Sequence, residues 1–320
     1  MKQALLVTIA LMAATPAMAQ TEASEMGTTT TAETPEGQVV STGRDEASRL
    51  TVPVMINGKG PFNFIVDTGA DRSVVSREVA ELLALPQAGK ATLHTMGGSD
   101  EIKTVLIDRL EVSNNVLRDV KAPALQERYL GADGLLGIDA LKNQRILFDF
   151  VAETMTIEPA NSKAVRDERD AAGTIIVTAR SRLGQLVLVD ADANGQDVWV
   201  VVDTGGQNTV GNSALRRLMI KRTPPEGFKP IELISVVGDR ISADYTVVGS
   251  MRVGGIRMNN AAVAFVDAHP FKRFGMLKKP SMLMGMDGLR SFRRVSIDFA
   301  NRRVKFLVPE GVVVPKAANN

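Results

Sequence analysis

The sequence predicts a mainly β protein built from two similar lobes that are related by a pseudo-twofold axis. Three observations lead to this prediction. Short apolar runs alternate with turn residues, which is typical of strands and hairpins. The runs of the first half recur in the same order in the second half, as expected for a duplicated unit. Each half also contains a helical pattern after its first hairpin.

Each half begins with a predicted hairpin that runs into an Asp-Thr-Gly sequence. Residues 50–66 lead into Asp67-Thr68-Gly69, and residues 186–202 lead into Asp203-Thr204-Gly205. An Asn-Gly pair, at 57–58 and again at 194–195, separates the two apolar runs of each hairpin. Asn-Gly is a strong turn signal between strands. The two Asp-Thr-Gly sequences are therefore expected at equivalent strand ends.

Further features follow each Asp-Thr-Gly in the same order. The helical patterns at 76–83 and 212–219 have N-cap candidates in Ser76 and in Asn212 or Ser213. Strands with a glycine-bearing turn come next. Matching apolar-apolar-Gly segments and closing strands complete each unit, at 135–141 and 148–150 in the first half and at 283–289 and 297–299 in the second.

Composition divides the chain into segments. Lys2, the apolar stretch 4–14 and Ala17-Met18-Ala19 predict a signal peptide over residues 1–19. Residues 20–44 contain few large apolar side chains and predict a flexible leader. The remaining predicted segments are an N-terminal lobe (45–160), a charged linker (161–172), a C-terminal lobe (173–311) and a flexible tail (312–320).

Several kinds of chemistry are excluded by composition. The 320-residue chain has no Cys, which excludes disulfides, thiolate catalysis and Cys metal ligands. A net charge of +2 with 4% aromatic residues does not favour nucleic-acid binding. The two histidines, His94 and His269, lie in unrelated sequence contexts without a zinc motif or a Gly-x-Ser-x-Gly elbow. We therefore expect no metal and no cofactor, and we interpret His94 as an ordinary strand residue.

The first Asp-Thr-Gly segment, Phe-Ile-Val-Asp-Thr-Gly-Ala-Asp from Phe64 to Asp71, resembles a motif of the retropepsin-like and pepsin-like aspartic peptidases. Leu135-Leu136-Gly137 and Leu283-Met284-Gly285 are similar to the apolar-apolar-Gly motif that follows it in that family. The resemblance covers roughly residues 50–310. It implies two homologous retropepsin-like (acid protease) β-barrel lobes, each with one short helix or two.

The same resemblance implies a catalytic site shared between the lobes. Asp67 and Asp203 would meet across the pseudo-twofold axis with a water between them, one carboxyl acting as base and the other as acid. Thr68 and Thr204 would bond across the lobes, while Gly69 and Gly205 would let the backbone approach the carboxylates. Substrate would lie extended between the lobes under hairpin flaps. The substrate-binding candidates are catalytic-loop or flap-tip residues: Ala70, Asp71, Gly206, Gly97, Gly98 and Gly238.

Two features depart from the retroviral pattern. In retroviral enzymes the Asp equivalent to Asp71 pairs with an Arg just after the later glycine. Ile138 and Met286 occupy those positions here, so this ion pair is expected to be missing. Gln207 replaces Asp71 in the second lobe. Both features suit an asymmetric single chain.

Together these observations predict a bacterial aspartic endopeptidase, periplasmic or secreted, that acts on a peptide or protein substrate. We expect no nucleic-acid partner, no stable membrane insertion after signal cleavage, and a monomer that forms a pseudo-dimer within one chain. One alternative is an exported peptide-binding protein with a peptidase-like cleft and little or no turnover, because Gly206 stands where Ala or Ser is usual. A second alternative is an enzyme that works only as a dimer.

Overall fold

The computed structural model describes residues 38–40, 43–44, 49–161, 173–182, 184–188, 191–193, 195–220, 227–254 and 256–309. The predicted signal peptide (1–19), most of the predicted leader and linker, and the predicted tail (312–320) lie outside the described residues. Within the described ranges, every helix is too short or too polar to cross a membrane.

The first lobe is a six-stranded β-barrel. Its strands pair in the order β3-β4-β9-β5-β8-β7, and β7 pairs with β3 to close the barrel. β6 (Gln87–His94) extends β7 as an outer hairpin strand. The barrel strands are β3 (Leu50–Ile56), β4 (Lys59–Val66), β5 (Val74–Ser76), β7 (Ser99–Val112), β8 (Asn115–Leu125) and β9 (Gly134–Leu136).

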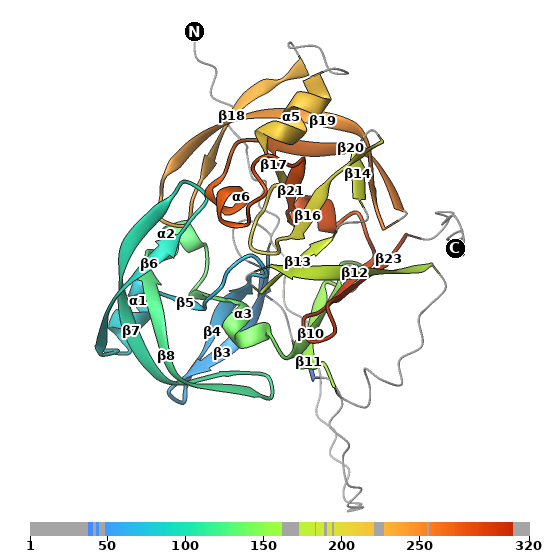
Figure 1. Ribbon diagram of the computed structural model, residues 1–320. Helices are drawn as coiled ribbons and strands as arrows, with labels where there is room; N and C mark the ends of the chain where they lie inside the picture. Colours follow the sequence, from blue (N-terminus) through green and yellow to red (C-terminus); the bar gives the residue numbers. More distant parts are fainter. Residues whose placement is uncertain are drawn as a thin grey trace, which may run out of the picture. The chain divides into compact units, whose positions relative to one another are not determined.

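The second lobe repeats this pairing order. Its strands run β13-β16-β21-β17-β20-β19-β14, and β18 (Lys229–Ile234) pairs with β19 as β6 pairs with β7. The two groups of strands are visible in Figure 1. The prediction of two equivalent β lobes is therefore confirmed. The strands are β13 (Gln185–Leu188), β14 (Ala191–Ala193), β15 (Gln196–Asp197), β16 (Trp199–Val202), β17 (Val210–Gly211), β19 (Arg240–Val253), β20 (Ile256–Phe265) and β21 (Ser281–Met284).

Each lobe carries three short helices in the described residues, where one or two were expected. Ser76 Oγ accepts a hydrogen bond from Val79 N at 3.0 Å, and Asn212 Oδ1 accepts one from Leu215 N at 2.9 Å. These bonds cap the two predicted helices, α1 and α5, so Asn212 rather than Ser213 is the second N-cap. The others are single turns, too short to show a period in the sequence. The helices are α1 (Arg77–Leu82), α2 (Glu127–Leu130), α3 (Ile138–Leu141), α5 (Ser213–Ile220), α6 (His269–Arg273) and α7 (Met286–Leu289).

A sheet made from both lobes joins the two halves of the chain. β10 (Gln144–Asp149) of the first lobe pairs antiparallel with β22 (Arg294–Asp298) of the second, with Ile146 opposite Ile297. β11 (Thr154–Pro159) lies beside β10, and β23 (Arg303–Leu307) lies beside β22. Beyond them, β1 (Gln38–Val40) pairs with β11 and β12 (Thr174–Arg182) pairs with β23. The sheet is therefore symmetric about the β10–β22 pair.

β1 and β2 (Gly43–Arg44) correct one prediction, because both fall inside the expected flexible leader (20–44). β1 pairs with β11, and β2 pairs with β3. The leader was predicted from its scarcity of large apolar side chains. Side-chain composition does not take account of backbone pairing. The backbone N–H and C=O groups at the edges of β11 and β3 can bond an extended segment whatever its side chains are.

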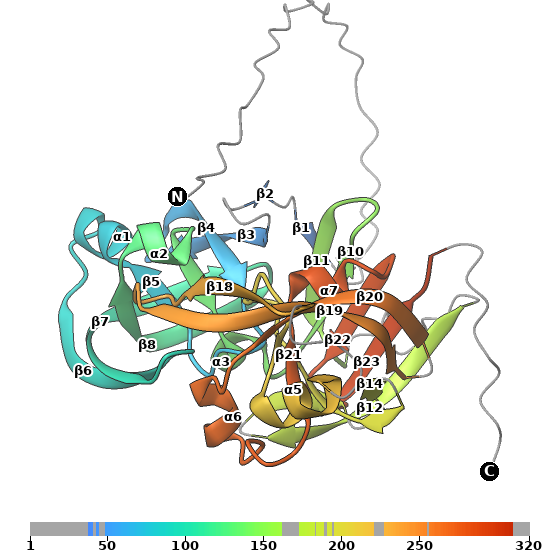
Figure 2. The ribbon, with the colours of Figure 1, turned by 90° about the horizontal axis from the view of Figure 1, so that it is seen from above.

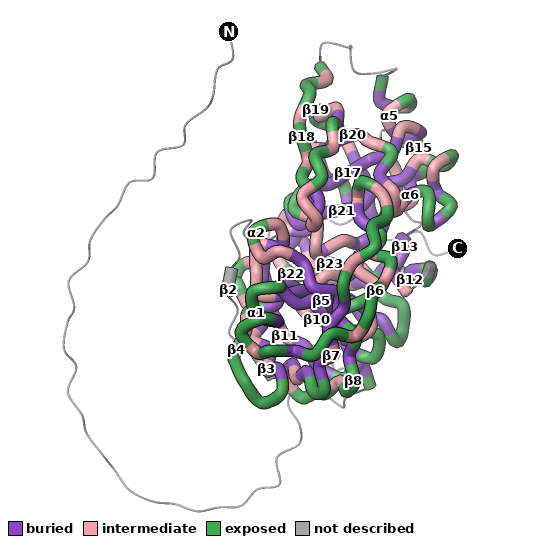
Figure 3. Tube along the Cα trace, turned by 90° about the vertical axis from the view of Figure 1, so that its left-hand side faces the viewer, coloured by how far each residue is buried: buried purple, intermediate pink, exposed green. Residues whose placement is uncertain are grey.

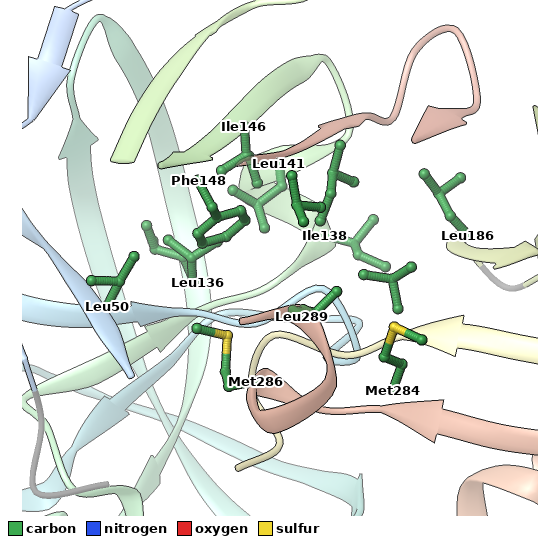
Figure 4. Packing of buried hydrophobic residues seen from close by; sticks show 14 of the residues in the cluster. Leu50, Leu136, Ile138, Leu141, Ile146, Phe148, Leu186, Met284, Met286 and Leu289 are labelled. Carbon is green, nitrogen blue, oxygen red and sulfur yellow. The ribbon is translucent and has the colours of Figure 1, made fainter. Parts of the chain in front are cut away.

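One apolar cluster runs through both lobes and the sheet between them. It includes Leu136, Ile146 and Phe148 from the first lobe, and Met286 and Leu289 from the second. Figure 4 shows these side chains close together. Figure 3 shows buried backbone around β10 and β22, whereas the hairpin strands β6 and β18 are mostly exposed or intermediate. The junction of the lobes is thus part of the hydrophobic core.

Truncation of Phe148 tests the importance of this junction. Its side chain is 1% exposed, so Phe148→Ala is expected to lower the free energy of unfolding by about 3–5 kcal/mol through lost burial and a cavity. Chemical denaturation measures the change. Val151→Ala, at a side chain that is 67% exposed, is the control and should cost less than about 0.5 kcal/mol. Equal effects of the two substitutions would contradict this account of the junction.

Candidate active site

Asp67 and Asp203 each follow the buried C-terminal end of a strand, β4 and β16 respectively. β4 runs parallel to β9, and β16 runs parallel to β21. Asp67 N donates a hydrogen bond to Leu136 O at 2.9 Å, and Asp203 N donates one to Met284 O at 3.0 Å. The apolar-apolar-Gly segments of the sequence therefore hold the first residue of each Asp-Thr-Gly loop.

The glycine of each of these segments packs directly against the loop. A Cβ on Gly137 would lie 2.5 Å from the carbonyl carbon of Arg72, and a Cβ on Gly285 would lie 2.6 Å from that of Asn208. No larger residue fits at this separation without moving backbone. The loop and its support therefore form one rigid unit in each lobe.

Thr68 and Thr204 link the two loops through reciprocal hydrogen bonds between the lobes. Thr68 Oγ1 donates to Val202 O at 2.7 Å and accepts from Thr204 N at 3.1 Å. Thr204 Oγ1 donates to Val66 O at 2.6 Å and accepts from Thr68 N at 3.1 Å. Both threonines are 2% exposed. The loops are thus fixed to each other by buried bonds with twofold symmetry.

The backbone of each loop also holds its own aspartate. Gly69 N and Ala70 N donate to Asp67 Oδ1 at 2.7 and 3.0 Å. Gly205 N and Gly206 N donate to Asp203 Oδ1 at 3.1 and 3.0 Å. Gly206 therefore supplies in the second lobe the hydrogen bond that Ala70 supplies in the first.

The two carboxyl groups approach the same small space. A Cβ on Gly69 would lie 2.8 Å from Asp203 Oδ1 and 3.2 Å from Asp67 Oδ1. A Cβ on Gly205 would lie 2.2 Å from Asp67 Oδ2. Glycine at both positions is what allows the two aspartates to come together across the lobes.

Both aspartates hold their protons more tightly than usual. Burial raises the pKa of Asp67 to about 7, and the charge of Asp203 adds to this, while hydrogen bonds from Gly69 and the positive charge of Arg49 oppose it. Burial also raises the pKa of Asp203, against hydrogen bonds from Gly206 and Gly205. Two carboxyl groups that share one site lose their protons in separate steps. The pair can therefore keep one proton at mildly acidic pH.

The aspartates lie in a cleft of about 1140 Å³ that is lined by residues of both lobes. Among the predicted substrate-binding residues, Ala70, Asp71 and Gly206 line this cleft. Gly97, Gly98 and Gly238 lie instead at hairpin tips between β6 and β7 and between β18 and β19, and are not among the lining residues. The neighbouring tip residues Thr95, Met96, Ser235 and Val236 line the cleft in their place.

The two hairpins cross to the opposite lobes. Met96 of the first hairpin packs against a second-lobe cluster that includes Phe271 and Phe274. Val236 and Val237 of the second hairpin pack against first-lobe residues such as Leu130. Figure 2 shows β18 and β19 extending toward α2 of the first lobe.

Tyr129 is a cleft residue that the sequence did not reveal. It lies on α2, lines the cleft, and would be 2.5 Å from a Cβ on Gly238. Gly238 is therefore required at the hairpin tip for close approach to this ring and for its φ of +94°. Nothing in the spacing of Tyr129 and Gly238 along the chain indicates this contact.

Asp71 has a basic partner from a part of the chain other than the position after the later glycine. Arg273 on α6 of the second lobe forms an ion pair with Asp71 through Nη1 and Oδ2. Gln185 Nε2 donates to Asp71 Oδ1 at 2.8 Å. The expectation considered only the positions of Ile138 and Met286, whereas the actual partners come from distant segments of the second lobe.

Arg49 is the second cleft residue that the sequence analysis missed. Its Nη1 donates to Gly205 O at 2.9 Å, and its Nη2 donates to Leu130 O. It stands before β3, next to the residues predicted to be a leader, and no motif singles it out. It is a buried cation that bonds the Asp-Thr-Gly loop of the other lobe.

His94 and His269 meet although their sequence contexts are unrelated. Their rings stack with centroids 5.1 Å apart and 11° between planes, and His94 Nδ1 lies 3.0 Å from His269 Nε2. His269 N also donates to Met96 O at 2.9 Å. The pair therefore ties the tip of the first hairpin to α6 of the second lobe. The interpretation of His94 as an ordinary strand residue missed this contact.

Metal binding has no support in the described residues. Across those ranges, no group of three or more His, Cys, Asp or Glu side chains is arranged to hold an ion. The polar groups of the cleft can instead move protons and position a backbone carbonyl.

The duplicated lobes, with two Asp-Thr-Gly loops meeting in one cleft, define a bilobed acid-protease architecture. Residues 52–143 match the family model described as "gag-polyprotein putative aspartyl protease", and residues 189–287 match the one described as "Aspartyl protease". The chain therefore carries two retropepsin-like aspartyl protease domains in tandem. No curated protein matches the sequence significantly.

Thr68→Val tests the bonds between the loops. The substitution leaves Val202 O and Thr204 N buried without partners, so it is expected to lower the free energy of unfolding by about 2–4 kcal/mol. Urea unfolding measures the loss. Thr68→Ser keeps the hydroxyl, removes one methyl group, and should cost about 1 kcal/mol. A Thr68→Val protein as stable as Thr68→Ser would show that these bonds contribute little.

Protonation of the histidine pair should loosen the first hairpin. Burial lowers the pKa of His269, with the charges of His94, Lys272 and Arg273 adding to the effect, so the folded protein favours the neutral ring. The folded protein therefore binds a proton at His269 less readily than the unfolded chain does, and the contact between the rings is expected to be weaker at about pH 5 than at about pH 8. We expect hydrogen exchange at residues 94–98, corrected for intrinsic rates, to lose protection as pH falls.

His94→Gln provides the control for this measurement, since an amide does not titrate in this range. Its hairpin should show the same protection at both pH values. Loss of protection on acidification in His94→Gln as well would show that the effect does not depend on the His94 ring.

Proposed function

We propose that the protein is an aspartic endopeptidase that hydrolyses peptide bonds with Asp67 and Asp203. The observation that carries the proposal is the geometry of the two carboxyl groups. They approach one space from equivalent loops, and burial raises the pKa of both. Such a pair holds one proton and one negative charge over a range of acidic pH.

In the proposed mechanism the two carboxyl groups act together on a water molecule. The ionised carboxylate takes a proton from the water as it attacks the peptide carbonyl carbon. The protonated carboxyl group donates a hydrogen bond to the carbonyl oxygen and then gives up its proton to it. The carboxyl group that took the proton from water then gives it to the leaving amine nitrogen, the C–N bond breaks, and a hydroxyl group of the intermediate returns a proton to the other carboxylate. The resulting acid and amine leave a pair that again holds one proton.

The cleft supports an extended, partly apolar peptide segment as substrate. Apolar side chains line both sides of the aspartates, with Val74 and Leu135 from the first lobe and Val210 and Leu283 from the second. Tip residues of the two hairpins line the same space. A cleft of this kind is suited to a main chain that passes between the lobes.

Location and assembly are also part of the proposal. The signal-peptide pattern of residues 1–19 and the absence of Cys favour a periplasmic or secreted protein. The bonds of Thr68 and Thr204 pair the two lobes within one chain, which supports a monomer as the active unit. The substrate would be a peptide or protein, with no nucleic acid or membrane partner.

The peptide-binding alternative loses its motivation at Gly206. That alternative rested on glycine in place of Ala or Ser after the second Asp-Thr-Gly. Gly206 N nevertheless bonds Asp203 Oδ1 at 3.0 Å, the distance at which Ala70 N bonds Asp67 Oδ1. The second carboxyl group therefore keeps the same backbone support as the first.

Asp67→Asn and Asp203→Asn test the proposed function. Each is expected to reduce peptide cleavage by at least about a thousandfold, because the remaining carboxyl group cannot act as acid and base in the same step. A diverse peptide mixture is incubated with the folded protein from pH 3 to 8, and new termini are identified by mass spectrometry. Activity should decline as the pH rises through about 7, where the last proton leaves.

Asp108→Asn makes the same chemical change at an exposed position of strand β7, and this variant should cleave like the unmodified protein. Cleavage that survives both substitutions at the dyad would contradict the assignment of Asp67 and Asp203. A folded protein that binds peptides but cleaves none in this pH range would favour the binding alternative.

A further inference from the structure

Arg49 and Gln185 occupy equivalent positions in the two lobes. Each stands 18 residues before the aspartate of its own lobe. Arg49 directly precedes β3, and Gln185 is the first residue of β13, which pairs with β16 as β3 pairs with β4. The duplication therefore places an arginine in one lobe where it places a glutamine in the other.

Both side chains reach across to the catalytic loop of the opposite lobe. Arg49 Nη1 donates to Gly205 O at 2.9 Å, and Gln185 Nε2 donates to Gly69 O at 3.1 Å. Gly205 and Gly69 are the equivalent glycines of the two Asp-Thr-Gly sequences. Arg49 is 9% exposed and Gln185 is 1% exposed. Each loop is thus tethered by a buried side chain of the other lobe.

The two tethers differ in charge. Gln185 is neutral and also donates a hydrogen bond to the carboxylate of Asp71, which forms an ion pair with Arg273. Arg49 carries a permanent positive charge and also donates to a backbone carbonyl, Leu130 O. A guanidinium donates five hydrogen bonds and does not lose its proton in proteins. One side of the catalytic pair therefore faces a fixed cation, and the other side faces an amide.

We infer that Arg49 is a positioning residue of the catalytic centre, which holds the Asp203 loop in place and keeps one carboxylate ionised in more acidic solution. Its neutral counterpart Gln185 supplies only the first of these effects. The inference rests on the proposed function, since it assigns a role within the same site. On this inference, the lowest pH at which the protein is active depends on Arg49, which lies outside both Asp-Thr-Gly motifs.

The electrostatics of the site agree with this role. The positive charge of Arg49 lowers the pKa of Asp67 and of Asp203 alike, against the larger effect of burial. Among the remaining charged side chains that line the cleft, Asp71 pairs with Arg273, Lys90 with Glu101 and Glu232 with Arg240. Arg72, Arg128 and His94 are exposed. None of these other side chains contributes to the shifts of the two aspartates.

The test is a direct titration of the two aspartates that does not depend on turnover. Asp side chains labelled with ¹³C at Cγ are followed by NMR from pH 2 to 9 in the unmodified protein, Arg49→Gln and Arg49→Lys. In Arg49→Gln the first ionisation of the pair should move upward by about one pH unit, because a nearby opposite charge is lost. Arg49→Lys keeps the charge, so its first ionisation should stay close to that of the unmodified protein.

Arg109→Gln is the matched control, since it removes the same charge from an exposed position of strand β7 and should leave the titration unchanged. If Arg49→Gln does not fold, Gln185→Arg provides the reverse test, because it adds a positive charge to the site instead of removing one. Asp71 is in place to pair with the new guanidinium. The first ionisation should then move downward.

An unshifted titration in folded Arg49→Gln, or an equal shift in Arg109→Gln, would overturn the role of Arg49. Peptide cleavage separates this outcome from failure of the proposed function. If the unmodified protein cleaves peptides, the acid limb of its pH profile should move with the titration in Arg49→Gln. If it cleaves none, the proposed function fails, while the titration still decides whether Arg49 controls the ionisation of the pair.

Discussion

The reciprocal hydrogen bonds of Thr68 and Thr204 are the constraint on which the rest of the site depends. Each threonine hydroxyl bonds the strand end and the backbone of the opposite loop, so neither loop can shift alone. The carboxyl groups are close only because the loops that carry them are locked in this way. The buried hydrogen bonds of the two threonines therefore offset the unfavourable free energy of holding two carboxyl groups close together in a buried space.

The fold and the centre of the site could be predicted from the sequence because both depend on local, repeated signals. Asp-Thr-Gly at two strand ends, Ser76 and Asn212 at two helix starts, and the later apolar-apolar-Gly segments each have a local physical reason. The repeat then predicts that equivalent elements occupy equivalent places. Strand order in the two lobes follows directly from this duplication.

The residues that the sequence did not reveal act through contacts between distant segments. Arg273 reaches Asp71 from α6, Tyr129 touches Gly238 from the other lobe, and His94 meets His269 across 175 positions. None of these pairs has a fixed spacing, because each depends on how the two lobes meet. Strand β1 was missed for a related reason, since its partner β11 lies more than a hundred residues away.

Duplication within one chain also permits a difference that two identical chains cannot have. In a symmetric dimer any substitution appears on both sides of the axis at once. Here the hydrogen bonds to Gly205 O and Gly69 O occupy equivalent places in the two lobes, but the side chains that donate them, Arg49 and Gln185, differ in charge. Asp71 and Gln207 differ in the same way. The geometry that brings the aspartates together is kept symmetric by the threonines and glycines, and the charge around them is free to diverge. Proton affinity at the centre can therefore change in one lobe without disturbing the bonds that assemble the pair.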